Sequence, residues 1–337
     1  MRYIIYGAGA IGGVVGGRLF AAGRETVLIC RGAHLDAIRT RGLTLREPGG
    51  ERVLPVPAVG HPRELRFRDG DVVVLTMKTQ DTTAALADLE AAGGAEAPVV
   101  CCQNGVANER MAARRFERVY AMLVALPATF LEAGIVTGFA APVAGVLDVG
   151  AYPSGVDELC RQIGADFSAA GFVCRPDPAV MRLKYAKLLS NLGNALEAVT
   201  SFHRSNDAAR EMMRKLREEA LTCYRAAGID AADAQEYNEH VNSKLQRVNL
   251  TSSKRGGTST WQSLVKGSER LETDYLNGEI VLLGKLHGVP TPYNAALRRL
   301  AQQIAAERKQ PGAYPLDEVE ALAQQLATSP AAPSPSG

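Results

Sequence analysis

Residues 2–12 are Arg-Tyr-Ile-Ile-Tyr-Gly-Ala-Gly-Ala-Ile-Gly, a short apolar run that ends in three glycines with the spacing G-x-G-x-x-G. The apolar run predicts a buried strand, and the periodicity that follows it predicts a helix. Between a strand and a helix, Gly7 allows a tight turn, Gly9 lets the backbone approach a pyrophosphate, and Gly12 lets the helix pack closely on the strand. The alternative is a structural turn that binds no ligand. We expect the turn to bind dinucleotide phosphates through Gly7, Ala8, Gly9, Ala10, Ile11 and Gly12.

Strand-like and helix-like segments alternate through the first half of the chain. Apolar runs recur at residues 26–30, 72–76, 98–102 and 119–126. This alternation predicts an α/β fold, in which helices cover both faces of a parallel sheet. Residues 130–149 are expected to extend the sheet with antiparallel strands.

The pattern changes after Pro176 and Pro178, where strand-like runs give way to helical periodicity. We therefore expect one domain over residues 1–178 and an all-helical domain over 179–325. Helices are expected over residues 179–199, 207–227, 231–248, 268–287 and 293–308. Residues 326–337 are mostly Pro, Ser and Ala and are expected to form a disordered tail.

Composition excludes several classes of protein. The 38 Lys and Arg residues against 36 Asp and Glu give a formal net charge of +2, which offers no basic footprint for nucleic acid or an anionic membrane. The longest weakly polar stretch, residues 134–151, contains a proline and an aspartate, so no membrane span is expected. The six cysteines lack the spacing of a metal or redox site. We expect a cytoplasmic protein with reduced core cysteines and no metal.

The residue after the second apolar run indicates the cofactor. Turns that prefer NAD place an Asp or Glu about 20 residues after the glycines, where it binds the ribose 2′-hydroxyl. Here that place holds Cys30 and Arg31, and no acid follows before Asp36. Because a guanidinium binds a 2′-phosphate through paired hydrogen bonds, Arg31 predicts NADP(H). The alternative is a solvated surface arginine.

Two polar residues follow later apolar runs of the predicted sheet. Lys78 follows residues 72–76, and Asn104 lies in a turn after residues 98–102. Since ligands of open α/β sheets bind at the carboxyl ends of the strands, both are candidates for the cofactor site. An ordinary solvated lysine and a local turn asparagine are the alternatives.

The order of motifs resembles that of ketopantoate reductases (2-dehydropantoate 2-reductases) over about residues 1–310. The resemblance rests on the glycine turn, Arg31, Lys78, the turn Gln103-Asn104-Gly105, Lys187 with Asn191, and Glu272-Thr273-Asp274-Tyr275-Leu276-Asn277-Gly278. It implies a Rossmann domain that binds NADPH, a helical domain, and an active site in the cleft between them. The implied pathway is pantothenate synthesis.

The resemblance also implies the roles of particular residues. Lys187 matches the family's general acid, in preference to Lys184 one turn earlier, and Glu272 matches a carboxylate that binds the substrate hydroxyl. A partly desolvated lysine ammonium is well suited to donate a proton to a carbonyl oxygen. The residues expected to bind substrate are Asn191, Asn194, Ser259 and Thr260.

This sequence departs from the family at two places. Ala195 occupies the usual position of the second asparagine, and Asn194 lies one residue earlier, about two helical turns after Lys187. Trp261 replaces a usual methionine.

The expected function is NADPH-dependent reduction of a small 2-oxo acid, with 2-dehydropantoate as the leading substrate. One alternative is a reductase of the same fold with another carbonyl substrate. The other is a non-catalytic protein that senses NADP(H), which would not need both Lys187 and Glu272. A homodimer is compatible with the sequence, which does not determine the oligomeric state.

Overall fold

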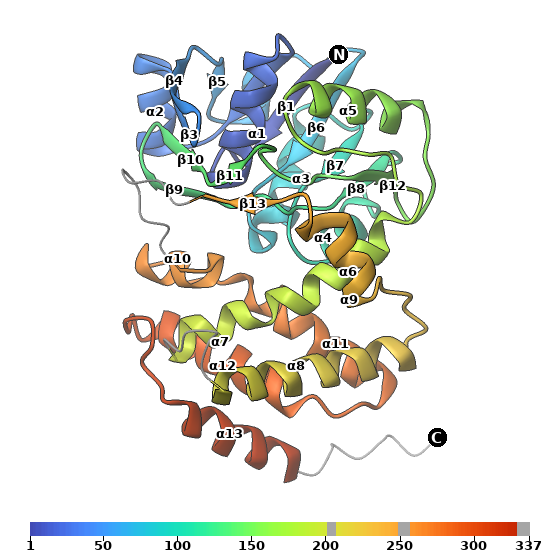
Figure 1. Ribbon diagram of the computed structural model, residues 1–337. Coiled ribbons are helices and arrows are strands. Elements are labelled where there is room, and N and C mark those ends of the chain that lie inside the picture. The colour runs from blue at the N-terminus through green and yellow to red at the C-terminus, as the bar shows by residue number, and fades with distance from the viewer. Residues whose placement is uncertain (201–206, 249–256, 329–337) are drawn as a thin grey trace. The chain divides into compact units, whose positions relative to one another are not determined.

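The computed structural model describes residues 1–200, 207–248 and 257–328 (Figure 1). Contacts divide the chain into two compact units. The first comprises Met1–Lys187 and Ala231–Arg255, and the second comprises Leu188–Asp230 and Gly256–Gly337.

The first unit is built on a seven-stranded sheet with the order β12-β8-β7-β6-β1-β2-β5. Adjacent strands are parallel, except that β12 runs antiparallel to β8. Strand order reverses between β1 and β6, as in doubly wound dinucleotide-binding sheets, and the predicted α/β fold is confirmed. The strands are β1 (Arg2–Tyr6), β2 (Glu25–Ile29), β5 (Ala58–Val59), β6 (Asp71–Leu75), β7 (Val99–Cys101), β8 (Val119–Met122) and β12 (Val149–Ala151).

Helices cover both faces of this sheet because both faces of its central strands are apolar. Tyr3 and Ile5 pack with α1 (Ala10–Ala21) and α5 (Glu158–Ala169). Ile4, between them, packs on the other face with α3 (Thr82–Ala91) and α4 (Asn108–Ala112). The near-continuous apolar strands are therefore those of a sheet that is buried on both sides.

A four-stranded sheet packs against α1 and has the order β4-β3-β10-β9. Its strand β10 is antiparallel to β9 but parallel to β3, so the antiparallel extension expected over residues 130–149 is only part of the arrangement. The strands are β3 (Leu43–Glu47), β4 (Gly50–Leu54), β9 (Ala128–Glu132) and β10 (Ile135–Gly138).

The helix expected over residues 231–248 does not form as one element. The chain instead forms α9 (Ala234–Tyr237), a π-helical turn (Asn238–Asn242) and β13 (Gln246–Arg247). Strand β13 pairs antiparallel with β11 (Ala140–Ala141), and the Val248 N–H donates to the Phe139 carbonyl oxygen at 2.9 Å. Pairing with a distant strand here overrides the local helical pattern and attaches the segment to the first unit.

Helix α6 (Val180–Asn191) contains the division between the units. Val180 and Leu183 pack in one apolar cluster with Ala121 and Leu123. These contacts explain why the first unit extends to Lys187, beyond the boundary expected near residue 178.

The single helix expected over residues 179–199 is interrupted at Leu192, and α7 (Gly193–Thr200) begins at the next residue.

The second unit is helical within its described residues, as expected. Helix α12 packs against α7, α8, α11 and α13 (Figure 1). Helices α10 and α13 lie outside the ranges expected from the sequence. Helix α13 includes residues 326–328 of the expected disordered tail, while residues 329–337 lie outside the described residues. The elements are α7, α8 (Asp207–Ala226), α10 (Ser259–Val265), the 3₁₀ turn η4 (Glu272–Tyr275), α11 (Asn277–His287), α12 (Pro292–Ala306) and α13 (Leu316–Thr328).

All six cysteines are free and buried, as the sequence predicts. Burial raises the pKa of Cys102 to about 12, so this thiol stays protonated and acts as a small core residue. In the described part of the chain, no helix has the length and apolarity needed to cross a membrane. The same residues contain no cluster of three or more His, Cys, Asp or Glu side chains suited to a metal.

Candidate functional site

The glycine turn follows β1, where the strand order of the sheet reverses. Gly7 has a φ of +100°, and a Cβ there would lie 2.6 Å from the main-chain nitrogen of Met77. A Cβ at Gly12 would lie 2.3 Å from Thr76 Oγ1 and 2.6 Å from the Gly7 carbonyl oxygen. Thr76 Oγ1 donates to the Gly7 carbonyl oxygen at 2.9 Å. The protein's own packing therefore requires glycine at positions 7 and 12.

Gly9 differs from these two glycines because no packing contact requires it. The nearest atom to a Cβ at Gly9 would be the Gly7 carbonyl oxygen, at 4.0 Å. The first-turn N–H groups of α1 lack intrahelical partners, and the positive end of the helix dipole lies at the same place. The turn thus forms an open cradle with the space and the donors that dinucleotide phosphates need.

His34, to which the sequence pattern assigned no role, holds the cradle from α2 (Gly32–Arg41). Its Nδ1 accepts a hydrogen bond from the Gly134 N–H at 2.8 Å, and its Nε2 lies 2.7 Å from the Ala8 carbonyl oxygen. Since Nδ1 is the acceptor, the network assigns the proton to Nε2, which donates to Ala8. The ring is buried against Phe130. Local periodicity carries no signal for this role, because both partners are distant in sequence.

Arg31 caps the N-terminus of α2 in an extended conformation, with φ of −133° and ψ of 163°. Its side chain is exposed and makes no hydrogen bond or ion pair with another described residue. The guanidinium, just beyond the carboxyl end of β2, is therefore available to an anion from solution.

The turns that carry Lys78 and Asn104 follow the neighbouring strands β6 and β7. Buried amides join them: Gln103 Nε2 donates to the Met77 carbonyl oxygen at 2.8 Å, and Asn108 Nδ2 lies 3.2 Å from both Thr79 Oγ1 and the Asn104 carbonyl oxygen. The first unit thus brings every residue predicted to bind cofactor to one edge of its sheet.

The two lysines of α6 lie in different surroundings. Lys184 is 3% exposed, and its Nζ lies 2.7 Å from Oε1 of Glu109, which is fully buried. Lys187, one turn later, is only half-buried. Lys184 is therefore held in a buried ion pair, and Lys187 is the lysine with access to solvent.

Asn194 and Ser259 lie on two packed helices of the second unit, α7 and α10. Asn194 Nδ2 donates to Ser259 Oγ at 3.3 Å, and Thr258 Oγ1 donates to the Asn194 carbonyl oxygen at 3.1 Å. Leu192 separates α6 from α7 but keeps a helical hydrogen bond, its N–H donating to the Leu188 carbonyl oxygen at 3.1 Å, and the alignment of Asn194 with Lys187 stays a prediction.

Asn191 and Thr260 each have a buried oxygen without a hydrogen bond. Asn191 is 5% exposed and Thr260 is 2% exposed, and neither Asn191 Oδ1 nor Thr260 Oγ1 has a hydrogen-bonding partner among the described residues. Buried polar atoms are normally paired in folded proteins. Both residues were predicted to bind substrate, and both have an oxygen available to a ligand.

Glu272 begins the turn η4 and is buried, with 7% of its surface exposed. The next residues attach the turn to α12: Gln302 Nε2 donates to Thr273 Oγ1 at 3.3 Å, and Arg298 pairs with Asp274 at 2.9 Å. Asp274 therefore stabilises the turn from its exposed side, whereas Glu272 is the buried carboxylate.

Comparison with known families gives two matches that follow the two halves of the chain. The family described as Ketopantoate reductase PanE/ApbA matches residues 3–153, and its C-terminal counterpart matches residues 179–305. The chain belongs to the ketopantoate reductase family. It is accordingly an NADP-dependent oxidoreductase that acts on a C=O/CH–OH pair.

Relatives match over nearly their whole length. The 2-dehydropantoate 2-reductase of Mesorhizobium japonicum is 29% identical over an alignment of 345 positions, which covers 91% of this chain and 99% of that protein. The enzyme of the same name from Pyrococcus horikoshii is 26% identical over 316 residues, covering 90% and 97%. A solved PanE/ApbA family ketopantoate reductase from Ralstonia eutropha is 29% identical, with a TM-score of 0.77 and coverage of 91% and 99%.

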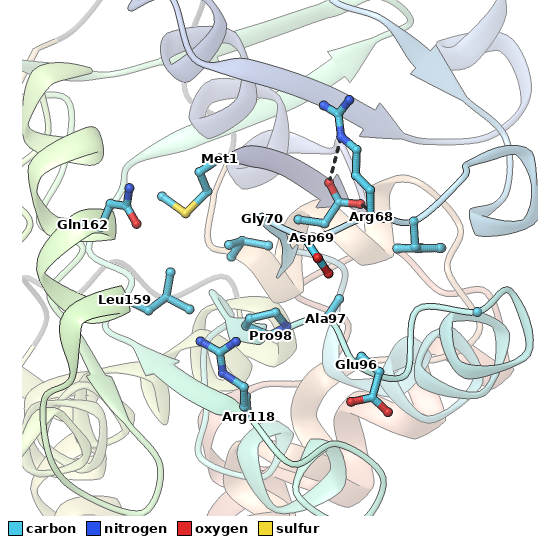
Figure 2. Close-up of a pocket in the computed structure, with 14 residues that line it drawn as sticks. Met1, Arg68, Asp69, Gly70, Glu96, Ala97, Pro98, Arg118, Leu159 and Gln162 are labelled. Atoms are coloured by element: carbon cyan, nitrogen blue, oxygen red, sulfur yellow. Dashed lines mark hydrogen bonds and ion pairs between the residues drawn. The ribbon is translucent and has the colours of Figure 1, made fainter.

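A pocket of about 570 Å³ lies at the opposite edge of the seven-stranded sheet (Figure 2). Met1, Pro98 and Arg118 line it, each directly before a strand. None of the residues predicted for the ketopantoate reductase site lines this pocket, and its charged residues have both signs. It therefore favours no particular class of ligand.

Proposed function

We propose that this chain reduces 2-dehydropantoate to pantoate with NADPH. The observation that carries the proposal is the pair of unpartnered buried oxygens, Asn191 Oδ1 and Thr260 Oγ1. A hydroxyl such as that of Thr260 donates a hydrogen bond to a carboxylate, and an amide oxygen such as that of Asn191 accepts one from a hydroxyl. A 2-oxo acid and its 2-hydroxy product present those two groups.

The cofactor-binding residues in this proposal belong to the first unit. The Gly9 cradle would hold the pyrophosphate, Arg31 the 2′-phosphate, and Lys78 and Asn104 the groups nearer the nicotinamide. The open space at Gly9 and the unpaired guanidinium of Arg31 fit this assignment. When bound, NADPH supplies the hydride that reduces the carbonyl carbon.

The remaining groups donate the proton and bind the substrate. Lys187 would donate a proton to the carbonyl oxygen as negative charge develops there, and its ammonium would stabilise that charge. Glu272 would accept a hydrogen bond from the new hydroxyl. Ser259 and Thr260 would bind the substrate carboxylate, while Asn191 and Asn194 would orient the substrate.

A steady-state assay tests the proposal. The loss of NADPH absorbance is followed with 2-dehydropantoate and with a panel of 2-oxo acids that have smaller, larger and aromatic side chains. We expect the largest kcat/KM with 2-dehydropantoate. A larger kcat/KM with another acid would reassign the substrate, and NADPH binding without turnover of any carbonyl would favour the NADP(H) sensor.

Cellular location and assembly belong to the same proposal. Six free cysteines are typical of a reducing compartment, which supports action in the cytoplasm. A homodimer is compatible with the proposed chemistry, and light scattering of the purified protein measures the oligomeric state directly.

A further inference from the structure

The buried ammonium of Lys184 joins α6 to the carboxyl ends of two strands of the first unit. Besides Glu109 Oε1, its Nζ lies 2.9 Å from the Gln103 carbonyl oxygen and 3.1 Å from that of Met122. The Cys101 carbonyl oxygen is a more distant neighbour at 3.4 Å. The three protons of the ammonium thus have one carboxylate and two main-chain acceptors at close range.

Glu109 depends on this lysine for neutralisation of its charge. It is fully buried, and apart from the ion pair with Lys184, its carboxylate oxygens have no hydrogen-bonding partner in the described ranges. Replacement of a buried ion pair by apolar side chains is often neutral or stabilising, because burial strips both charges of water. Stability alone therefore does not account for an ion pair at this place, whereas its directional contacts give it a use in geometry.

Two groups of the proposed site are attached to this ion pair. Gln103, whose carbonyl oxygen accepts from Lys184, directly precedes Asn104. Lys187 follows Lys184 on α6 by three residues, a rise of about 4.5 Å along the helix. The contacts of Lys184 with the strand ends therefore set both the height and the rotation of α6 at Lys187.

We propose that Lys184 and Glu109 are positioning residues that hold Lys187 and the Asn104 turn in catalytic register. The proposal rests on the proposed function, in which Lys187 is the proton donor. A displacement of about 1 Å in a reacting group costs on the order of 100-fold in rate. Loss of the Lys184 contacts should therefore lower kcat, while the residues that bind the cofactor phosphates remain in place.

The test separates positioning from stability by removing first one charge and then both. Lys184→Met leaves Glu109 buried and unpaired, so the melting temperature should fall. The double variant Lys184→Met/Glu109→Met removes both charges, so most of the melting temperature should return. Its Kd for NADPH should stay within about threefold of the parent, whereas its kcat should remain roughly 10- to 100-fold lower. A double variant that regains the parental kcat with its stability would overturn the proposal.

A second variant covers the case in which the double variant does not fold. Lys184→Arg keeps the charge that neutralises Glu109, but a planar guanidinium cannot reproduce the contacts of a compact ammonium. It should fold and bind NADPH with a lowered kcat, and a folded Lys184→Arg protein with parental kcat would overturn the proposal.

Two controls distinguish failure of this proposal from failure of the proposed function. Arg182→Ala, on the same helix but paired with Glu236 at the surface, should leave kcat unchanged. A parent without 2-dehydropantoate turnover would refute the proposed function itself, and a Lys187→Ala protein with parental kcat would remove Lys187 as its proton donor. If Lys187→Ala is inactive while Lys184→Arg or the double variant retains parental kcat, only the positioning proposal is refuted.

Discussion

Replacement of Gly9 by alanine distinguishes a cofactor cradle from a turn that serves only the fold. The added methyl group would meet no atom of the protein closer than the Gly7 carbonyl oxygen at 4.0 Å. Gly9 has a φ of −75° and a ψ of −146°, and this ψ lies outside the regions allowed to residues with a Cβ, so alanine carries backbone strain there. The methyl group therefore meets no neighbouring group of the protein, and it occupies the space where we place the pyrophosphate.

The structure predicts a modest effect on stability and a larger effect on binding. Alanine restricts the unfolded chain more than glycine does, which stabilises by about 0.4–1 kcal/mol, but the backbone strain at this ψ costs about 1–3 kcal/mol, so Gly9→Ala should lower stability modestly. If the methyl group prevents one charge-assisted hydrogen bond to the pyrophosphate, the loss is about 1.5–3 kcal/mol. That loss corresponds to a roughly 10- to 100-fold weaker Kd for NADPH.

Thermal unfolding and a fluorescence titration with NADPH measure the two effects separately. Gly12→Ala is the matched comparison, because its methyl group would lie 2.6 Å from the Gly7 carbonyl oxygen. Overpacking of this kind costs about 1–3 kcal/mol, so Gly12→Ala should lower the melting temperature as well as weaken binding. If Gly9→Ala binds NADPH as tightly as the parent, no phosphate lies against Gly9 and the cradle assignment is refuted.

Three further predictions concern the other groups of the site. Arg31→Ala should raise the KM for NADPH roughly 10- to 100-fold and leave the KM for NADH nearly unchanged, because only NADPH carries the 2′-phosphate. An equal rise in KM for both cofactors would mean that Arg31 supports the fold instead. Lys187→Ala should lower kcat by about 10²–10⁴-fold with little change in NADPH affinity, and Arg182→Ala is its control because Lys184 lies in a buried ion pair. A Lys187→Ala protein that loses NADPH affinity and keeps kcat would argue against a general acid. Thr260→Val should raise the KM for the 2-oxo acid about tenfold. It should not lower the melting temperature, since the buried hydroxyl has no hydrogen-bonding partner among the described residues. An unchanged KM would remove Thr260 from the substrate site.

The sequence predicted those features that depend on local patterns. Alternating apolar strands and helices, together with the glycine spacing, sufficed for the α/β fold and for the sheet edge where the predicted cofactor residues lie. Residues 231–248 were wrongly expected to be helical because their pairing with β11 involves a partner distant in sequence. The buried contacts of His34 and Lys184 were missed for the same reason, since Gly134 and Glu109 lie far from them in the chain. A single-residue break at Leu192 likewise leaves no mark on a helical periodicity.

The return of residues 231–248 to the first unit has a consequence for synthesis on the ribosome. Helix α8 of the second unit is made before Ala231, so the first unit still lacks β13 when part of the second has already emerged. Until then Asp148, which is fully buried in the finished protein, lacks its contact with His240. Domains usually fold in the order in which they are synthesised. Here the first unit is completed only after residues 188–230 of the second unit have been synthesised. A gene divided after residue 187 would encode a first unit without the contact between Asp148 and His240.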